Sequence, residues 1–134
     1  MFGTLDISTS GLIAQRQRME VIASNMANRN TIYDAHGKYA PFRRRIAVLG
    51  AGDPTTGKAQ GVHVEQIKLD DSPLRAVFDP DNPNADGDGN VFYPTIDPAM
   101  EMVNALDASR AYEANITAAE AAKSMMQSSL RLLA

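Results

Sequence analysis

The segment SGLIAQRQRMEVIASNMAN, residues 10–28, contains most of a series of apolar residues spaced seven positions apart. The members of this series are Leu5, Leu12, Met19 and Met26, with Ile22 in the second seam position. A seven-residue repeat places such side chains on one narrow stripe of a helix, and the stripe requires a partner helix. The only other segment long enough to supply one runs from residue 98 to about residue 133. We therefore predict two terminal helices that lie side by side.

The C-terminal helical segment has a clear start and no internal breaker. Asp97 is a preferred N-cap residue, Pro98 suits the first helical turn, and neither Gly nor Pro follows up to residue 134. A stripe of larger side chains runs along this segment: Val103, Leu106, Tyr112, Ile116, Ala119, Met126, Leu130 and Leu133. Alanines on several sides indicate packing against more than one neighbouring helix. The simpler explanation is the high helix propensity of alanine.

The ends of the N-terminal helix are less sharply marked. Three residues could cap its start, and the sequence does not choose among Asp6, Ser8 and Ser10. Three asparagines should end it, since this residue favours the left-handed conformation at helix ends: Asn25, Asn28 and Asn30. Gly11 lies within the pattern and has two interpretations, a local weakness of the helix or the close approach of a second backbone.

Between the helices the pattern changes to that of short strands. Residues 43–49 and 62–69 predict a hairpin, with residues 50–57 as a long loop at its tip. The alternation of apolar residues shifts by one position near Gln66, which indicates a bulge. The fold class is therefore α+β, with a small antiparallel β module over residues 31–96 inserted between helical segments 1–30 and 97–134.

Two further strands are expected at residues 74–78 and 91–93, joined by an Asp-rich loop over residues 79–90. Asn84, Asp86 and Asp88 follow the alternate spacing of an EF-hand loop. The last position of that frame is Thr95 instead of Glu, and prolines replace the preceding helix. A solvated turn is therefore the better interpretation of this loop. We expect no metal site, no cofactor site and no catalytic site in the chain.

Composition excludes several functional classes. The chain of 134 residues carries a net charge of −3, no Cys and no Trp, so disulfides, thiolate metal sites and Cys nucleophiles are absent. Only 6% of residues are aromatic, which predicts a small core that needs neighbouring molecules for stability. Residues 1–8 lack the features of a secretory signal. Nucleophile, phosphate-loop and metal motifs are missing, which argues against an enzyme.

The densest basic run is Arg43-Arg44-Arg45. Alternate residues of a strand point to opposite faces, so the run could protect the edge of a sheet. The alternative is a docking site for an acidic neighbour. Nucleic acid is a poor candidate partner, because the net charge is acidic and the run is short.

Both ends of the chain carry motifs of a known family. The N-terminal residues 10–28, followed by Asn30-Thr31, resemble the N-terminal signature of bacterial flagellar rod and hook proteins. At the other end, residues 93–98, 101–103, 108–115 and 122–126 resemble the C-terminal signature of the same family. The short length, residues 41–45 and residues 78–80 before the Asp-rich loop are most similar to proximal rod proteins.

This resemblance implies a structural rod subunit that assembles through its terminal helices into a helical tube and transmits torque. It implies synthesis in the cytoplasm, export by the flagellar type III apparatus without cleavage, and a place in the periplasm-spanning rod of the basal body. Implied partners are further copies of the chain, the rod proteins FlgB and FlgF, and FliE. The alternative is a helical adaptor that forms a small closed oligomer. The subunit contacts are expected at Leu5, Leu12, Met19, Ile22, Met26, Val103, Leu106, Tyr112, Ile116, Ala119, Met126 and Leu130.

Overall fold

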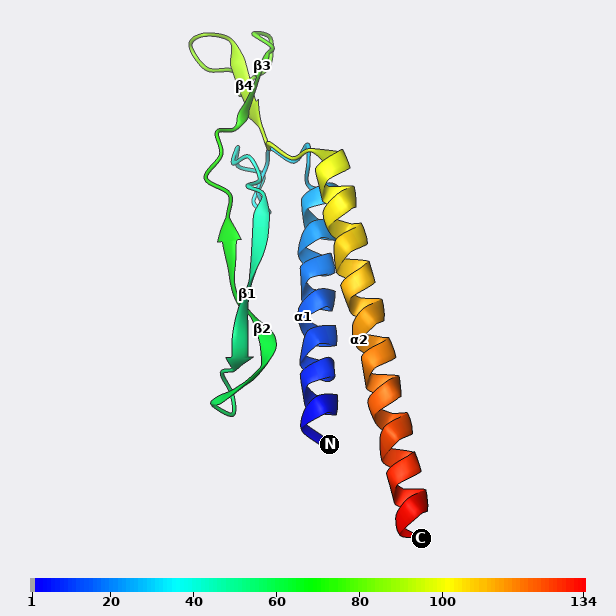
Figure 1. The fold of residues 1–134 in the computed structure, drawn as a ribbon. Helices are drawn as coiled ribbons and strands as arrows, with labels where there is room; N and C mark the ends of the chain where they lie inside the picture. Colours follow the sequence, from blue (N-terminus) through cyan, green and yellow to red (C-terminus); the bar gives the residue numbers. More distant parts are fainter. Residues whose placement is uncertain (1) are drawn as a thin grey trace.

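The structure, a computed structural model, describes residues 2–134 and has the predicted α+β architecture. Its elements follow the chain in the order α1 (Phe2–Ala27), β1 (Arg45–Asp53), β2 (Lys58–Leu69), β3 (Arg75–Phe78), β4 (Asn90–Tyr93) and α2 (Pro98–Leu133). The two helices lie side by side and antiparallel, which confirms the expected pairing of the chain termini (Figure 1).

Helix α1 is the central element of the molecule. The β1–β2 hairpin packs along one side of α1 and α2 packs along the other, so the helix has neighbours on two faces (Figure 1). Helix α2 has 36 residues and α1 has 26. The last turns of α2 therefore extend past the start of α1, and both termini lie at the same end of the molecule (Figure 1).

The start of α2 is capped as the sequence predicts. Asp97 has an extended backbone, its Oδ1 accepts a hydrogen bond of 2.9 Å from the amide of Ala99, and Pro98 occupies the first turn. This side chain satisfies one of the amide groups that a helix start leaves without a partner, which is worth about 1 kcal/mol. The helix then continues to Leu133 without interruption.

The predicted caps of α1 are wrong. The helix is already formed at Phe2, so Asp6, Ser8 and Ser10 all lie inside it. The Ser10 hydroxyl donates to the carbonyl of Ile7 at 2.7 Å instead of capping a free amide. The end of α1 lies where the prediction places it, because the helix stops at Ala27 and the amide and side chain of Asn28 both donate to the Ser24 carbonyl. The predicted reason is wrong, since Asn25 lies inside the helix and no described asparagine has a left-handed backbone.

The β1–β2 hairpin is longer than predicted and its turn is shorter. Val48 pairs with Gln66 and Leu49 pairs with Val64, so Glu65 is the extra residue of a bulge next to Gln66, as expected. The strands extend to Asp53 and Lys58, and only residues 54–57 form the turn. The glycines at residues 50, 52 and 57 suggested a loop. In the structure Gly52 has a positive φ, and the strand pairing continues past it through a second register shift between Ala51 and Asp53.

Strands β3 and β4 form a separate two-stranded sheet that projects beyond the end of the helix pair (Figure 1). The β module therefore consists of two hairpins. The Tyr39 hydroxyl accepts from the Phe92 amide at 2.9 Å and ties β4 to the loop that follows α1. In the Asp-rich turn, Asp86 Oδ1 accepts from the backbone amides of Asp88 and Asn90. The carboxylate at the centre of the turn thus stabilises the turn itself.

The apolar core is small. Among the described residues, the buried apolar side chains are Ala14, Val21, Ile22, Ile32, Val91, Ala108 and Ala122. Aromatic rings contribute none of these, so the burial that stabilises most domains of this size is limited. Neither described helix is long and apolar enough to span a lipid bilayer.

Candidate assembly interface

Small and polar residues form the contact between α1 and α2. Gly11 of α1 is buried beneath the side chain of Asn115, and Ala108 and Ala122 of α2 are buried as well. Of the two interpretations of Gly11, close approach is the correct one, although a side chain and not a backbone makes it. The heptad residues of α1 lie beside this contact and stay half-buried: Leu5, Leu12, Met19 and Met26. They therefore retain exposed apolar surface.

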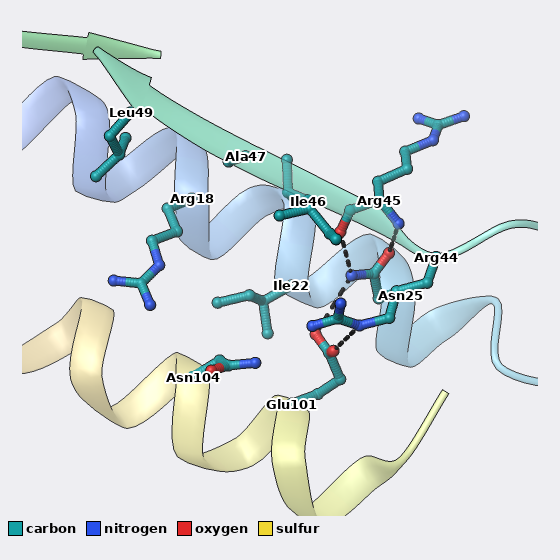
Figure 2. Close-up of a pocket in the computed structure, with 11 residues that line it drawn as sticks. Arg18, Ile22, Asn25, Arg44, Arg45, Ile46, Ala47, Leu49, Glu101 and Asn104 are labelled. Carbon is teal, nitrogen blue, oxygen red and sulfur yellow. Dashed lines mark hydrogen bonds and ion pairs between the residues drawn. The ribbon is translucent and has the colours of Figure 1, made fainter. Parts of the chain in front are cut away.

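Asn25 joins three elements of the fold (Figure 2). Its Oδ1 accepts from the Arg45 amide at 2.9 Å, and its Nδ2 donates to the Arg45 carbonyl at 2.8 Å. The same Nδ2 donates to Oε2 of Glu101 at 3.3 Å. The side chain is 1% exposed. Asn25 therefore pairs with the backbone of β1 much as a neighbouring strand would, and it links that strand to both helices.

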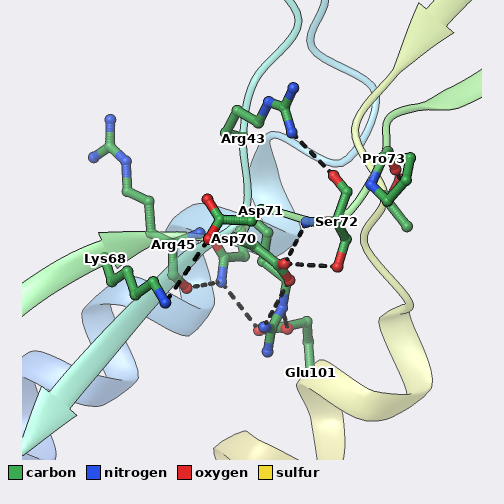
Figure 3. A network of polar contacts seen from close by, with 11 residues as sticks. Arg43, Arg45, Lys68, Asp70, Asp71, Ser72, Pro73 and Glu101 are labelled. Carbon is green, nitrogen blue, oxygen red and sulfur yellow. Dashed lines mark hydrogen bonds and ion pairs between the residues drawn. The ribbon is translucent and has the colours of Figure 1, made fainter.

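Glu101 is the buried acidic residue of this cluster and is 0% exposed. Its Oε1 accepts from Arg44 Nε at 2.5 Å, and the Arg44 Nη1 also lies 3.4 Å from Oδ2 of Asp70 (Figures 2 and 3). A buried charge is tolerated only when it is paired and hydrogen-bonded, and Arg44 and Asn25 together provide that. We call Asn25, Arg44 and Glu101 the polar clamp.

Asp70 completes the outer edge of the clamp. Hydrogen bonds from the hydroxyl and the amide of Ser72 hold the pKa of Asp70 below its usual value, and Arg44 adds to this effect. The amide of Asp70 also donates to the Arg44 carbonyl at 2.8 Å. The carboxylate is therefore stabilised in its charged form, close to the guanidinium that binds Glu101.

Of the three arginines in the run 43–45, Arg44 binds acidic residues of this chain, Glu101 and Asp70, and not those of an external partner. Arg43 donates to the carbonyl of Ser72 at 2.9 Å (Figure 3). The Arg45 guanidinium lies 5.3 Å from the ring centre of Phe42. At Arg45, the free backbone amide and carbonyl of the β1 edge are hydrogen-bonded by the Asn25 side chain. This pairing, and not the arginine charge, protects the edge there. From the sequence, Asn25 is predicted only to end the helix, and no sequence pattern indicates its pairing with Arg45.

A second polar contact holds the lower part of the hairpin against α1. The Ser10 hydroxyl accepts from the amide of Val62 at 3.1 Å. The preceding residue, Gly61, has a φ of +95°, and a β-carbon there would lie 2.8 Å from Ser10 Oγ. A side chain at this position would therefore be strained and would also collide with Ser10.

The spaces around the hairpin are open and incompletely filled. A cavity of about 250 Å³ adjoins the polar clamp and is lined by Arg18, Ile22 and Asn104 among others (Figure 2). Two larger grooves, of about 580 and 450 Å³, run between α1 and β2. Within residues 2–134, no three His, Asp or Glu side chains come close enough together to hold a metal ion.

The predicted contact residues fall into three groups by exposure. Ile22 is buried inside the chain, where it faces the cavity beside the clamp (Figure 2). The half-buried ones are Leu5, Leu12, Met19, Met26, Tyr112, Ala119 and Met126. The exposed ones are Val103, Leu106, Ile116 and Leu130. All of the predicted residues except Ile22 therefore retain exposed surface, and the four exposed ones all lie on α2.

Comparison with known proteins matches both ends of the chain to one group of families. The family described as "Flagella basal body rod protein" matches residues 5–32, which cover most of α1. The family described as "Flagellar basal body rod FlgEFG protein C-terminal" matches residues 89–132, which cover β4 and nearly all of α2. The matched segments are thus the two helices that pair in the structure.

Relatives named flagellar basal-body rod protein FlgC are similar over almost the whole length. The chain is 40% identical to the one from Yersinia enterocolitica, 38% to that from Salmonella typhimurium and 37% to that from Bacillus subtilis. Each alignment covers 98% of this chain and 97% of the relative. The chain therefore belongs to the FlgC family of flagellar basal-body rod proteins and is a structural subunit of that rod.

Proposed function

We propose that this chain is a self-assembling subunit of the proximal rod, which polymerises through its two terminal helices into a helical tube and transmits torque. The observation that carries this proposal is the exposed apolar surface of α2. Val103, Leu106 and Leu130 are each more than half exposed on a helix that already has one neighbour. A helix with apolar residues outside its internal contact requires further partners to bury them.

The half-buried heptad residues of α1 extend this surface to the second helix: Leu5, Leu12, Met19 and Met26. With Val103, Leu106, Tyr112, Ile116, Ala119, Met126 and Leu130, they form the proposed subunit contacts. Ile22 supports them from inside the chain. The mechanism is mechanical, since packed helices transmit force along their axes and no bond is made or broken.

The family supplies the remaining parts of the proposal. Export by the flagellar type III apparatus without cleavage would bring the chain to the periplasm-spanning rod. Its neighbours there would be copies of itself, FlgB, FlgF and FliE. A chain that orders fully only when neighbours cover its helices would suit passage through a narrow export channel, because ordering is then coupled to assembly.

The test compares two substitutions at equally exposed sites. Val103→Asp places a charge on α2, where the side chain is 53% exposed, and Ile67→Asp does the same on β2, where it is 54% exposed. We expect Val103→Asp to prevent incorporation into isolated basal bodies and Ile67→Asp to leave it intact. Equal incorporation of both variants would contradict the proposal.

Analytical sedimentation of the full chain separates this function from that of a helical adaptor. An adaptor would form one closed oligomer whose size does not change with concentration. A rod subunit should be monomeric when dilute and open-ended when concentrated, because a contact between unlike surfaces need not close. A single closed species at all concentrations would overturn the rod proposal.

A further inference from the structure

Arg18 of α1 is a half-buried arginine whose charge is not paired within the fold. Figure 2 shows its side chain reaching from α1 toward α2, into the cavity of about 250 Å³ beside the polar clamp. Within residues 2–134, the guanidinium forms no hydrogen bond, ion pair or ring contact. Asn104, which lines the same cavity from α2, likewise has no side-chain partner among these residues. The cavity therefore contains one positive charge and several hydrogen-bond donors that the fold leaves unused.

The acidic residue of this cavity is already bound by other side chains. Glu101 Oε1 accepts from Arg44, and Oε2 accepts from Asn25. The apolar side chains that line the cavity are Val21, Ile22, Ile46 and Leu49. An unpaired charge in such surroundings is unfavourable, and an ion pair formed there is stronger than one in open water. Arg18 therefore lowers the stability of the isolated chain and is suited to bind a carboxylate from outside it.

The Asp-rich turn of a second copy offers carboxylates that also lack partners. This turn, residues 79–90, contains four Asp and no Lys or Arg. Asp81 and Asp88 are exposed, and neither side chain has a partner in the described part of the chain. The β3–β4 hairpin carries the turn beyond the end of the helix pair (Figure 1), whereas Arg18 lies nine residues before Ala27, roughly 14 Å back along α1. The turn therefore projects away from the Arg18 of its own chain and toward neighbouring molecules.

We propose that the cavity of one copy binds an Asp carboxylate from the Asp-rich turn of the next copy, through Arg18 and Asn104. This inference rests on the proposed rod function and names a contact outside the packing of the helices. The guanidinium would form a charge-assisted hydrogen bond with the carboxylate, and the amide of Asn104 would supply a further donor. The two surfaces are unlike, so the contact is heterologous and leaves a free cavity at one end of an assembly and a free turn at the other.

Arg18→Gln should affect the folded chain and its assembly in opposite directions. Thermal unfolding of the dilute full-length chain should show an unchanged or higher melting temperature, because an unpaired charge is removed. The protein concentration at which open-ended polymer appears should rise at least about tenfold, because the carboxylate of the next copy loses its ion pair. A lower melting temperature, or polymer at an unchanged concentration, would overturn the proposal.

Arg16→Gln is the matched control for this change of charge. The Arg16 side chain is 66% exposed and lies 3.7 Å from Glu20, as an exposed pair that contributes little. Both the melting temperature and the polymerisation concentration should therefore stay unchanged. An equal rise in polymerisation concentration for Arg16→Gln and Arg18→Gln would show that net charge, and not the cavity, controls assembly.

A double-mutant cycle tests the Asp-rich turn as the partner. Asp81→Asn/Asp88→Asn removes the two unpartnered carboxylates and should raise the polymerisation concentration by a factor similar to that of Arg18→Gln. Combining all three substitutions should cause no further loss, because they break the same contact. Asp71→Asn, at a side chain that is 91% exposed outside the turn, is the control and should have no effect. Losses that multiply would show two separate sites and overturn the pairing.

The outcomes also separate this contact from the rod function itself. If Arg18→Gln and the unmodified chain form open-ended polymers at the same concentration, the cavity contact is wrong and the rod function stands. If the unmodified chain forms only a closed oligomer, both proposals fail. If Arg18→Gln prevents assembly and Asp81→Asn/Asp88→Asn does not, the Asp-rich turn is wrong as the partner.

Discussion

Gly11 of α1 lies directly beneath the side chain of Asn115 of α2, and a β-carbon on Gly11 would stand 2.6 Å from Asn115 Oδ1. The Asn115 Nδ2 donates to the Ala111 carbonyl of its own helix at 2.8 Å, which holds the amide flat over the glycine. The glycine costs α1 about 1 kcal/mol of helix propensity relative to alanine. That cost is offset by the close packing of the two helices.

Gly11→Ala is expected to lower the free energy of unfolding despite the better helix propensity of alanine. The added methyl group collides with Asn115, and overpacking of this kind costs about 1–3 kcal/mol. The double variant Gly11→Ala/Asn115→Ala removes the collision and should recover most of the loss. Urea denaturation of the three proteins measures both effects. A single variant more stable than the unmodified chain would show that the collision is absent.

Glu101→Ala is expected to destabilise the fold by about 3 kcal/mol, because it leaves the Arg44 guanidinium and the Asn25 amide without their buried acceptor. Glu113→Ala, at an exposed position of the same helix, is the matched control and should change stability by less than about 0.5 kcal/mol. Thermal unfolding followed by circular dichroism compares the two. Similar melting temperatures for both variants would refute the clamp.

Asn25→Asp tests whether the clamp fixes the hairpin to the helices. The substitution keeps the shape of the side chain but removes the two hydrogen bonds that Nδ2 donates, and it places a carboxylate against the Arg45 carbonyl and Glu101. We expect faster amide hydrogen exchange at Arg45 and its neighbours in β1, with the β3–β4 hairpin unaffected. Unchanged protection at Arg45 would mean that packing alone holds β1 in place.

Asp70 should make stability depend on pH in the acidic range. Its folded-state pKa is lowered, mainly by hydrogen bonds from Ser72 and in addition by Arg44. The stabilisation is therefore fully present above the unfolded pKa of about 3.9 and is lost as pH falls through the lower folded value. Asp70→Asn should flatten the acid side of a stability profile measured by urea denaturation. Asp71→Asn, at a neighbouring exposed carboxylate, should leave that side of the profile unchanged.

Local patterns in the sequence predicted most of the secondary structure. The Asp97 cap, the uninterrupted run to Leu133, and the bulge beside Gln66 were all confirmed. Each depends on residues only a few positions apart, whose backbone preferences act locally. The extension of β1 to Asp53 was not predicted, because glycine disfavours strands unless a particular pairing requires its positive φ.

The polar clamp could not have been predicted in the same way. Asn25 and Glu101 are 76 positions apart, and Arg44 and Glu101 are 57 positions apart. Nothing in the spacing of these residues indicates which glutamate of α2 is buried, because that depends on the angle and register at which α2 meets α1. The heptad stripe was misleading in a related way, since small residues make the tightest helix contact and the larger heptad residues flank it.

The sequence by itself determined the two terminal helices, the antiparallel β module between them and membership of the flagellar rod family, because periodicity, capping residues and paired terminal motifs are written along the chain. Only the tertiary structure decided which face of each helix is used internally and which remains available. That choice follows from burial: Gly11, Ala108 and Ala122 allow the closest approach, so they lie inside. Larger apolar residues of α2, such as Val103, Leu106 and Leu130, are left exposed.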